Sequence, residues 1–204
     1  MKISKLLLIV FLISMFSCAF SQTKEYRINN FVDYQKLHKT IAIVPIGITI
    51  DPKSMPRDLF VDDLDRIHEE ESVLLQDYFY ITNLNENQKD KLSAELQDVR
   101  KTNLSLATNK ITFFNILNFS KEDLAKFCAV DVIIAISFYK SSQNNNGKLR
   151  NSVDLKISIF DKSGLLLWEY YDSTTADSKK THLSLEKELL DKIAKKLPYR
   201  EKIK

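Results

Sequence analysis

Two long apolar runs place the strongest limit on how this chain can fold. Lys39–Ile50 (KTIAIVPIGITI) and Val130–Tyr139 (VDVIIAISFY) are rich in β-branched residues and lack a polar–apolar alternation. Such runs are typical of strands that are buried on both faces of a sheet. Pro45 has no amide hydrogen for the sheet ladder, so the first strand is expected to bend or end near it.

Several stretches have the three- and four-residue spacing of helices. Residues 31–38 predict a short helix, and Pro56 suits the first turn of a long helix over residues 56–80. One face of the long helix is apolar and is predicted to pack on the core, whereas the opposite face is acidic. The apolar stripe is formed by neighbouring residues together with Phe60, Leu64, Ile67, Leu74 and Tyr78. A last helix over residues 182–197 is expected to end before Pro198.

The middle of the chain predicts a mixture of elements. Asn83–Lys91 is polar and reads as a loop, Leu92–Val99 as a strand, and residues 102–108 as a short helix. Ser120, with Asp123 three residues later, resembles a capping box. It is expected to start a helix that leads into the second apolar run.

Alternation of apolar and polar residues begins after Lys140–Lys148, which is the most loop-like segment of the sequence. From Val153 to Ile159 every second residue is apolar, as in a half-exposed antiparallel strand. Gly164 suits the turn into a returning strand over residues 165–174. The order of elements predicts an α/β fold: a single-layer mixed sheet of about four to five strands, with an antiparallel hairpin edge and packed helices.

The amino-terminal residues have the pattern of a secretory signal peptide. Lys2 and Lys5 precede an uncharged apolar run of eleven residues, Leu6–Phe16. That length fits a signal peptide and is shorter than the roughly 20 residues of a membrane-spanning helix. Retention of the segment as an uncleaved anchor is the less favoured interpretation.

Two cleavage sites compete in this segment. Ala19 and Ser21 match the small-x-small rule of signal peptidase, which predicts a cut between Ser21 and Gln22. Alternatively, the cut falls before Cys18 and that residue is lipidated, although Phe16 is bulky for a lipoprotein signal. The first cut gives a soluble protein, periplasmic or secreted, and the second gives a membrane-anchored lipoprotein.

The predicted layout is a signal peptide (1–21), a lead-in (22–38), a single α/β domain (39–199) and a basic tail (200–204). Loss of Lys2 and Lys5 leaves 28 basic against 27 acidic residues in a chain of about 183 residues. That length suits one domain. The near-neutral charge gives no indication of a nucleic-acid partner, and contact with a membrane is expected only if Cys18 is lipidated.

Motifs for catalysis, metals and cofactors are weak, so no catalytic, metal-binding or cofactor-binding residue is predicted. The three glycines are too far apart for a phosphate-binding loop. His38, His68 and His182 lack partners at metal-ligand spacing, and the acidic run at residues 62–65 lacks the glycine of a calcium loop. Cys128 is expected to be a buried, inert thiol.

Trp168, Tyr170 and Tyr171 could stack on a sugar or a peptide, but residues of a sheet that alternate between core and surface are the favoured interpretation. Carboxylate pairs of the glycosidase type have no sequence signature among 27 acidic residues.

Three segments and the closing helix together resemble a known group of exported proteins. The segments are Lys39–Ile46, Leu124–Phe138 and Val153–Tyr170, and the closing helix ends in LPY. The layout is similar to small bacterial envelope proteins of the CsgG, LpoB and TolB-amino-terminal type, and is nearest to uncharacterised proteins of Bacteroidota. The resemblance implies an α/β fold without shared catalytic residues, and Ala129 and Val130 stand where the group often has glycine.

These observations predict an exported, non-catalytic cell-envelope protein that acts through contact with an envelope protein of unknown identity. A sheet edge or the loop at Asn144–Asn146 is the expected contact surface. Two alternatives stay open. A small-ligand or lipid-binding module would need an apolar cavity lined by the long helix, and an envelope-polymer hydrolase would need converging carboxylates with shifted pKa values.

Overall fold

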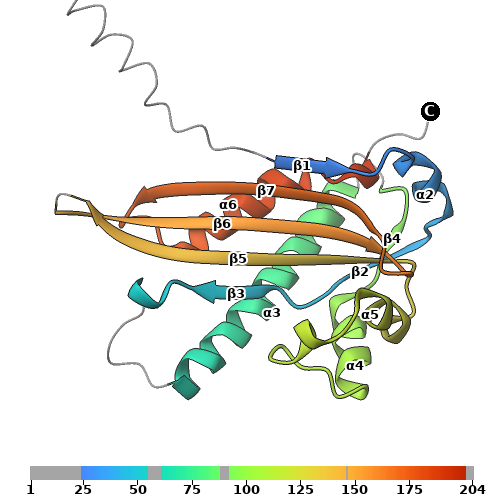
Figure 1. The fold of residues 1–204 in the computed structure, drawn as a ribbon, viewed down its shortest axis with the longest axis horizontal. Helices are drawn as coiled ribbons and strands as arrows, with labels where there is room; N and C mark the ends of the chain where they lie inside the picture. The colour runs from blue at the N-terminus through green and yellow to red at the C-terminus, as the bar shows by residue number, and fades with distance from the viewer. Residues whose placement is uncertain (1–23, 55–60, 88–91, 146, 201–204) are drawn as a thin grey trace, which may run out of the picture.

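The computed structural model describes residues 24–54, 61–87, 92–145 and 147–200, and Figure 1 shows their arrangement. One seven-stranded mixed sheet runs in the order β1-β7-β6-β5-β2-β4, and β3 pairs with β5 beyond the end of β2. The strands are β1 (Lys24–Arg27), β2 (Thr40–Ile43), β3 (Gly47–Ile50), β4 (Glu95–Leu96), β5 (Val132–Asn145), β6 (Lys148–Asp161) and β7 (Leu166–Asp177). β2 pairs in parallel with β4 and β5, and β3 pairs in parallel with β5. The pairs β5–β6, β6–β7 and β7–β1 are antiparallel.

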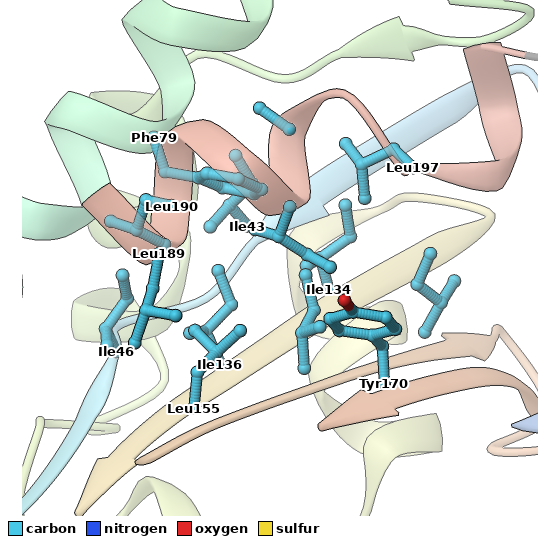
Figure 2. Close-up of a cluster of buried hydrophobic side chains, with 14 of the residues drawn as sticks. Ile43, Ile46, Phe79, Ile134, Ile136, Leu155, Tyr170, Leu189, Leu190 and Leu197 are labelled. Atoms are coloured by element: carbon cyan, nitrogen blue, oxygen red, sulfur yellow. The ribbon is translucent and has the colours of Figure 1, made fainter. Parts of the chain in front are cut away.

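Helices cover the two faces of this sheet unequally. They are α2 (Phe31–Leu37), α3 (Val61–Asn87), α4 (Val99–Thr108), α5 (Lys121–Cys128) and α6 (His182–Ala194). α3 and α6 cross one face, where the main core lies (Figures 1 and 2). α4 and α5 form a smaller core with Ala42, Val44 and Ile133 on the other face. Among the described residues, no helix covers the rest of that second face.

The main core is formed by side chains from β2 to β7 and from the helices α2, α3 and α6. Figure 2 shows Ile134 and Ile136 of β5 near Tyr170 of β7, with Phe79 of α3 and Leu190 of α6 above them. All five are at most 4% exposed. β5 is apolar at successive positions because its side chains alternate between the two cores. Ile134 points into the main core, and Ile133, the residue before it, points into the smaller one.

The predicted break at Pro45 is confirmed. Ile43 pairs with Ile134 and Gly47 pairs with Ser137, so the chain uses four steps where β5 uses three. The extra residue acts as a bulge that separates β2 from β3 along one edge of β5. Gln76 of α3 donates from Nε2 to the carbonyl oxygen of Ile43 at 2.7 Å, which satisfies a group at the end of β2.

The α/β class is confirmed, but the predicted strand count was too small. β1 was not predicted, and the first predicted strand is divided into β2 and β3. The segment Lys140–Lys148, predicted to be a loop, instead belongs largely to the β5–β6 hairpin. Lys140 and Ser141 at its start are buried, and the polar side chains that follow suit a strand that extends beyond both cores into solvent. Likewise, Asn83–Asn87 continue α3 rather than forming a loop, and the strand expected over Leu92–Val99 shrinks to Glu95–Leu96.

The predicted apolar stripe on α3 was displaced by one position. Ile67 and Leu74 are 39% and 43% exposed, whereas Leu75 and Phe79 are fully buried. Leu64 is half-buried, and Tyr78 packs against the rim of the core. Phe60 lies outside the described residues.

Other predicted features are confirmed. Ser120 caps α5, because its side chain accepts a hydrogen bond from the backbone amide of Asp123 at 3.0 Å. Gly164 has a φ of 80° in the turn between β6 and β7. The predicted cleavage residues Ser21 and Gln22, the alternative lipidation site Cys18, and residues 201–204 lie outside the described residues.

Candidate functional site

A groove lies on the open face of the sheet and reaches the outer edge of β3. We call it the β3 groove, and its volume is about 540 Å³. The segment between α4 and α5 forms one wall, the strands form the floor, and α3 contributes at the sheet edge. Its lining includes Pro45, Gly47, Ile48, Thr49, Asp65, His68, Phe113, Phe114, Ile116, Leu117, Lys121, Ala135, Ser137, Lys156, Ser158 and Phe160.

Small residues make the floor of the β3 groove hollow. Gly47, Ala135, Ser137 and Ser158 come from three adjacent strands and all line it. A Cβ atom added to Gly47 would lie 3.5 Å from Cβ of Ser137, which is an ordinary van der Waals contact, so the two positions are neighbours on the floor. Larger side chains on these strands would fill the space that the groove now offers.

The wall at residues 112–119 presents apolar side chains to solvent. Phe114 is 53% exposed and Leu117 is 79% exposed, whereas Ile116 between them is buried in the smaller core. The side chain of Asn115 fixes the turn, because its Oδ1 accepts from the amide of Thr112 at 2.7 Å. Burial of Ile116 therefore anchors this turn, and the turn holds Phe114 and Leu117 outward.

β3 also offers a strand edge to this groove. The amide of Asp51 donates to the carbonyl oxygen of Lys140 on β5 at 2.8 Å. Alternate residues of a parallel strand bond to opposite sides, so the backbone groups of Thr49 face β5 and those of Ile48 and Ile50 face outward. Among the described residues no strand pairs with that outer side. Unpaired edges of this kind are able to accept another strand.

Two lysines differ in the charges that surround them. Lys156 lies 2.9 Å from a carboxylate oxygen of Glu169, and its pKa is raised by hydrogen bonds to Tyr171 and Glu169. Lys121 is half-buried, with its Nζ 6.0 Å from the centre of the Phe160 ring. Burial lowers the pKa of Lys121, and no ion pair joins it to an acidic side chain within the described parts of the chain.

His68 connects the β3 groove with a buried ionic cluster, which consists of Glu71, Lys140 and Glu186. Its Nε2 atom is buried and has no hydrogen-bond partner among the described residues. Its pKa is lowered, first by burial and then by the positive charge of Lys140. His68 is therefore neutral near pH 7.

The ionic cluster joins three elements inside the main core. Lys140 of β5 lies 2.6 Å from a carboxylate oxygen of Glu71 on α3 and 3.6 Å from one of Glu186 on α6. Glu186 is fully buried, and burial raises its pKa to about 8. A carboxyl group with such a shift, as in Glu186, could serve acid–base chemistry, but neither Glu186 nor Glu71 lines the β3 groove.

The stability of the protein is expected to fall as the pH rises between the ordinary carboxyl pKa and about 8. In this window the folded chain keeps a proton on Glu186 that the unfolded chain has released. The folded state then binds more protons, so a rising pH favours unfolding. Urea denaturation at several pH values, followed by circular dichroism, measures the slope, and Glu186→Gln is expected to reduce it.

Glu188→Gln is the matched control for that series. Glu188 lies on the same helix with its side chain 48% exposed, so its replacement should leave the pH dependence unchanged. Equal slopes for the wild type and Glu186→Gln would show that Glu186 does not titrate as proposed.

The structure places the other residues that sequence reasoning singled out in structural roles. Cys128 is 1% exposed and burial raises its pKa to about 11, as expected of a buried thiol. Trp168 and Tyr170 are fully buried and stack on each other at 5.8 Å, which confirms the core interpretation, and Tyr171 is 37% exposed on the open face. His38 bonds to the hydroxyl of Tyr199 at 2.6 Å in the core.

Within the described residues, no three His, Cys, Asp or Glu side chains are grouped so that they could hold a metal ion. Among the described helices, none combines the length and the apolar character that a membrane crossing requires.

Sequence reasoning did not find the β3 groove. Its lining comes from segments that lie up to about a hundred residues apart, between Val44 and Phe160. The available signal was the apolar segment TFFNILNF at residues 112–119, which is bounded by polar residues and matches neither helix nor strand periodicity. The long helix does contribute to the groove, through Asp65 and His68.

Comparison of the sequence with protein-family models and with curated proteins gives no match. Several solved structures are similar to this chain in part. Lipoprotein GNA1162 from Neisseria meningitidis is 14% identical, with a TM-score of 0.47, and the match covers 78% of this chain and 97% of that one. The PelC dodecamer from Paraburkholderia phytofirmans is 9% identical, with a TM-score of 0.43, and 84% and 95% of the two chains are covered.

The carboxy-terminal domain of LpoB from Salmonella enterica is 8% identical, with a TM-score of 0.37. The match covers 67% of this chain and 82% of that one. LpoB, one of the proteins that the sequence resembles, is thus among the similar structures, while the resemblance to CsgG, to the TolB amino-terminal domain and to Bacteroidota proteins stays a prediction.

Proposed function

We propose that this chain is an exported, non-catalytic protein of the cell envelope that acts through contact with another envelope protein. The contact surface is the rim of the β3 groove, formed by Phe114, Leu117 and the outer edge of β3. The observation that carries this proposal is the exposed pair of apolar side chains in the same groove as a strand edge that no other described strand pairs with.

A partner segment in extended form suits this surface. Its backbone would pair with the outward amide and carbonyl groups of Ile48 and Ile50, as in other complexes formed by strand addition. Its apolar side chains would pack on Phe114 and Leu117, which are exposed at present. Removal of such apolar area from water supplies affinity, at about 25 cal/mol per Å² before the costs of association.

The proposed location follows from the amino-terminal pattern. Cleavage between Ser21 and Gln22 places the protein in the periplasm or the medium, and lipidation of Cys18 would hold it at a membrane. Both locations leave the rim of the β3 groove available to a partner, because the groove is built from residues beyond Val44.

Leu117→Asp is expected to remove partner binding, because it places a charge in the centre of an apolar contact. A loss of about tenfold or more corresponds to one well-packed anchor residue. The measurement compares the amount of each envelope protein that a tagged chain recovers from crosslinked cells, quantified by mass spectrometry.

Leu37→Asp provides the matched control. Leu37 lies on α2 and is 74% exposed, close to the 79% of Leu117, so the same change of charge and volume is made away from the groove. A partner that is recovered equally by both variants would contradict the proposed surface, and recovery of no specific protein by the wild type would contradict the proposed function.

A further inference from the structure

We infer that the floor of the β3 groove binds a small amphiphile, a free molecule with one apolar chain and one carboxylate, whose carboxylate pairs with Lys121. This inference goes beyond the protein contact at the rim, because it concerns the hollow beneath Phe114 and Leu117 rather than their outward surfaces.

The size and lining of the hollow suit an apolar chain. Its volume of about 540 Å³ lies within the range of about 300–1,000 Å³ that is usual for small-molecule sites. Gly47, Ala135 and Ser137 keep the floor low, and the rings of Phe113 and Phe160 line its sides. An alkyl chain placed there would contact apolar atoms without displacing a core residue.

The charges around the hollow favour a ligand with a single negative charge. Glu169 already neutralises Lys156, whereas Lys121 has only the face of the Phe160 ring nearby within the described residues. Asp65 also lines the groove, but it is exposed on α3 and keeps its hydration. One uncompensated and partly desolvated cation matches one carboxylate better than a dianionic phosphate.

Burial lowers the pKa of Lys121, since the ammonium group has lost part of its hydration. A carboxylate at this place would offset that cost through a charge-assisted hydrogen bond. Binding of an anion therefore costs Lys121 less hydration than it would cost an exposed lysine.

A free molecule fits this site better than the headgroups of a membrane. Glu122 and Asp123 follow Lys121 directly and are both exposed. These two carboxylates would repel an anionic bilayer surface. A monomeric acid can enter the groove beside Lys121 without bringing other negative charges close to them.

Isothermal titration calorimetry with octanoate, below its micelle-forming concentration, tests the inference on the full mature chain. Octanoate is expected to bind the wild type, and Lys121→Met is expected to weaken it about tenfold or more. Octan-1-ol, which has the same chain without the charge, should bind weakly and equally to both proteins. Lys126→Met, on the exposed face of the same helix, should behave like the wild type.

A second pair of variants tests the hollow itself. Ser137→Leu fills the floor and should abolish octanoate binding, whereas Ser173→Leu makes the same change at an exposed position of β7 and should not. Circular dichroism confirms that each variant is folded.

Three results would overturn the inference: no octanoate binding to the wild type, binding that survives Ser137→Leu, or equal affinity for octanoate and octan-1-ol. Sedimentation with phosphatidylglycerol vesicles that depends on Lys121 would also overturn it, by assigning the charge to a membrane surface. None of these results bears on partner recovery by Leu117→Asp, so this inference and the proposed protein contact fail separately.

Discussion

Lys140→Met is expected to lower the free energy of unfolding by about 3–5 kcal/mol at neutral pH. The Lys140 ammonium is 5% exposed and lies 2.6 Å from Glu71, whose side chain is 16% exposed. Methionine keeps most of the side-chain volume but removes the cation. The Glu71 carboxylate would then remain in the core without its partner, which is the costly way to break a buried ion pair.

Two further variants separate charge from packing in this experiment. Lys156→Met removes a lysine of similar geometry whose side chain is 46% exposed, and an exposed pair of this kind contributes at most about 1 kcal/mol. The double variant Lys140→Met with Glu71→Gln should recover most of the loss, because no charge is left behind. Urea denaturation gives all values, and a double variant that is as unstable as the single one would show that the loss is not electrostatic.

Leu75→Ala is expected to destabilise the protein by about 2–5 kcal/mol, because it opens a cavity in the main core. Leu75 is fully buried on the face of α3 that also carries Phe79. The adjacent Leu74 is 43% exposed, so Leu74→Ala should change the free energy of unfolding by no more than about 0.5 kcal/mol. These neighbouring leucines differ only in the direction that the helix gives them.

The same pair tests the correction of the predicted stripe on α3. If that stripe were right, Leu74→Ala would be the damaging change and Leu75→Ala the harmless one. Thermal or urea unfolding of the two variants therefore distinguishes the observed helix face from the predicted one.

The sequence pattern misplaced this face for a physical reason. The buried side of α3 carries Ser72, Gln76 and Asn83 in addition to its apolar residues. Gln76 bonds to the carbonyl of Ile43 and to Asn103, and Asn83 bonds to Phe79 and to Arg200. Because these partners lie elsewhere in the chain or on the backbone, periodicity of apolar residues alone assigns such polar side chains to solvent.

The strands were predictable where burial or alternation is strong. The apolar runs around Ile43 and Ile134 and the alternation from Val153 to Ile159 correspond to β2, β5 and β6. The outer halves of β5 and β6, beyond Lys140, are polar and were predicted to be a loop. These halves are held by the ladder between Ser141 and Ser152 and the pairs that follow it, and their buried side chains, Ser141 and Asn151, are polar. Hydrophobic patterning therefore carries little signal for them.

The candidate site could not be predicted from the sequence, because the groove depends on small side chains that leave space as much as on the side chains that line it. The β3 groove exists because Gly47, Ala135, Ser137 and Ser158 are small and meet on one face. Small residues at isolated positions are common, and only the strand register brings these four together. Of the two predicted contact surfaces, a sheet edge is the one proposed here, at β3, and the loop at Asn144–Asn146 includes a residue outside the described part of the chain.

Photo-crosslinking in cells tests whether the rim of the β3 groove touches a partner in the cell envelope, as proposed. A benzophenone amino acid replaces Leu117 in the full chain, expressed in its own cells, and a second strain carries it at Leu37. Position 117 is expected to give one discrete crosslinked species above the mass of the chain, and position 37 is expected to give none. Equal crosslinking at both positions, or none at position 117, would contradict the proposed contact.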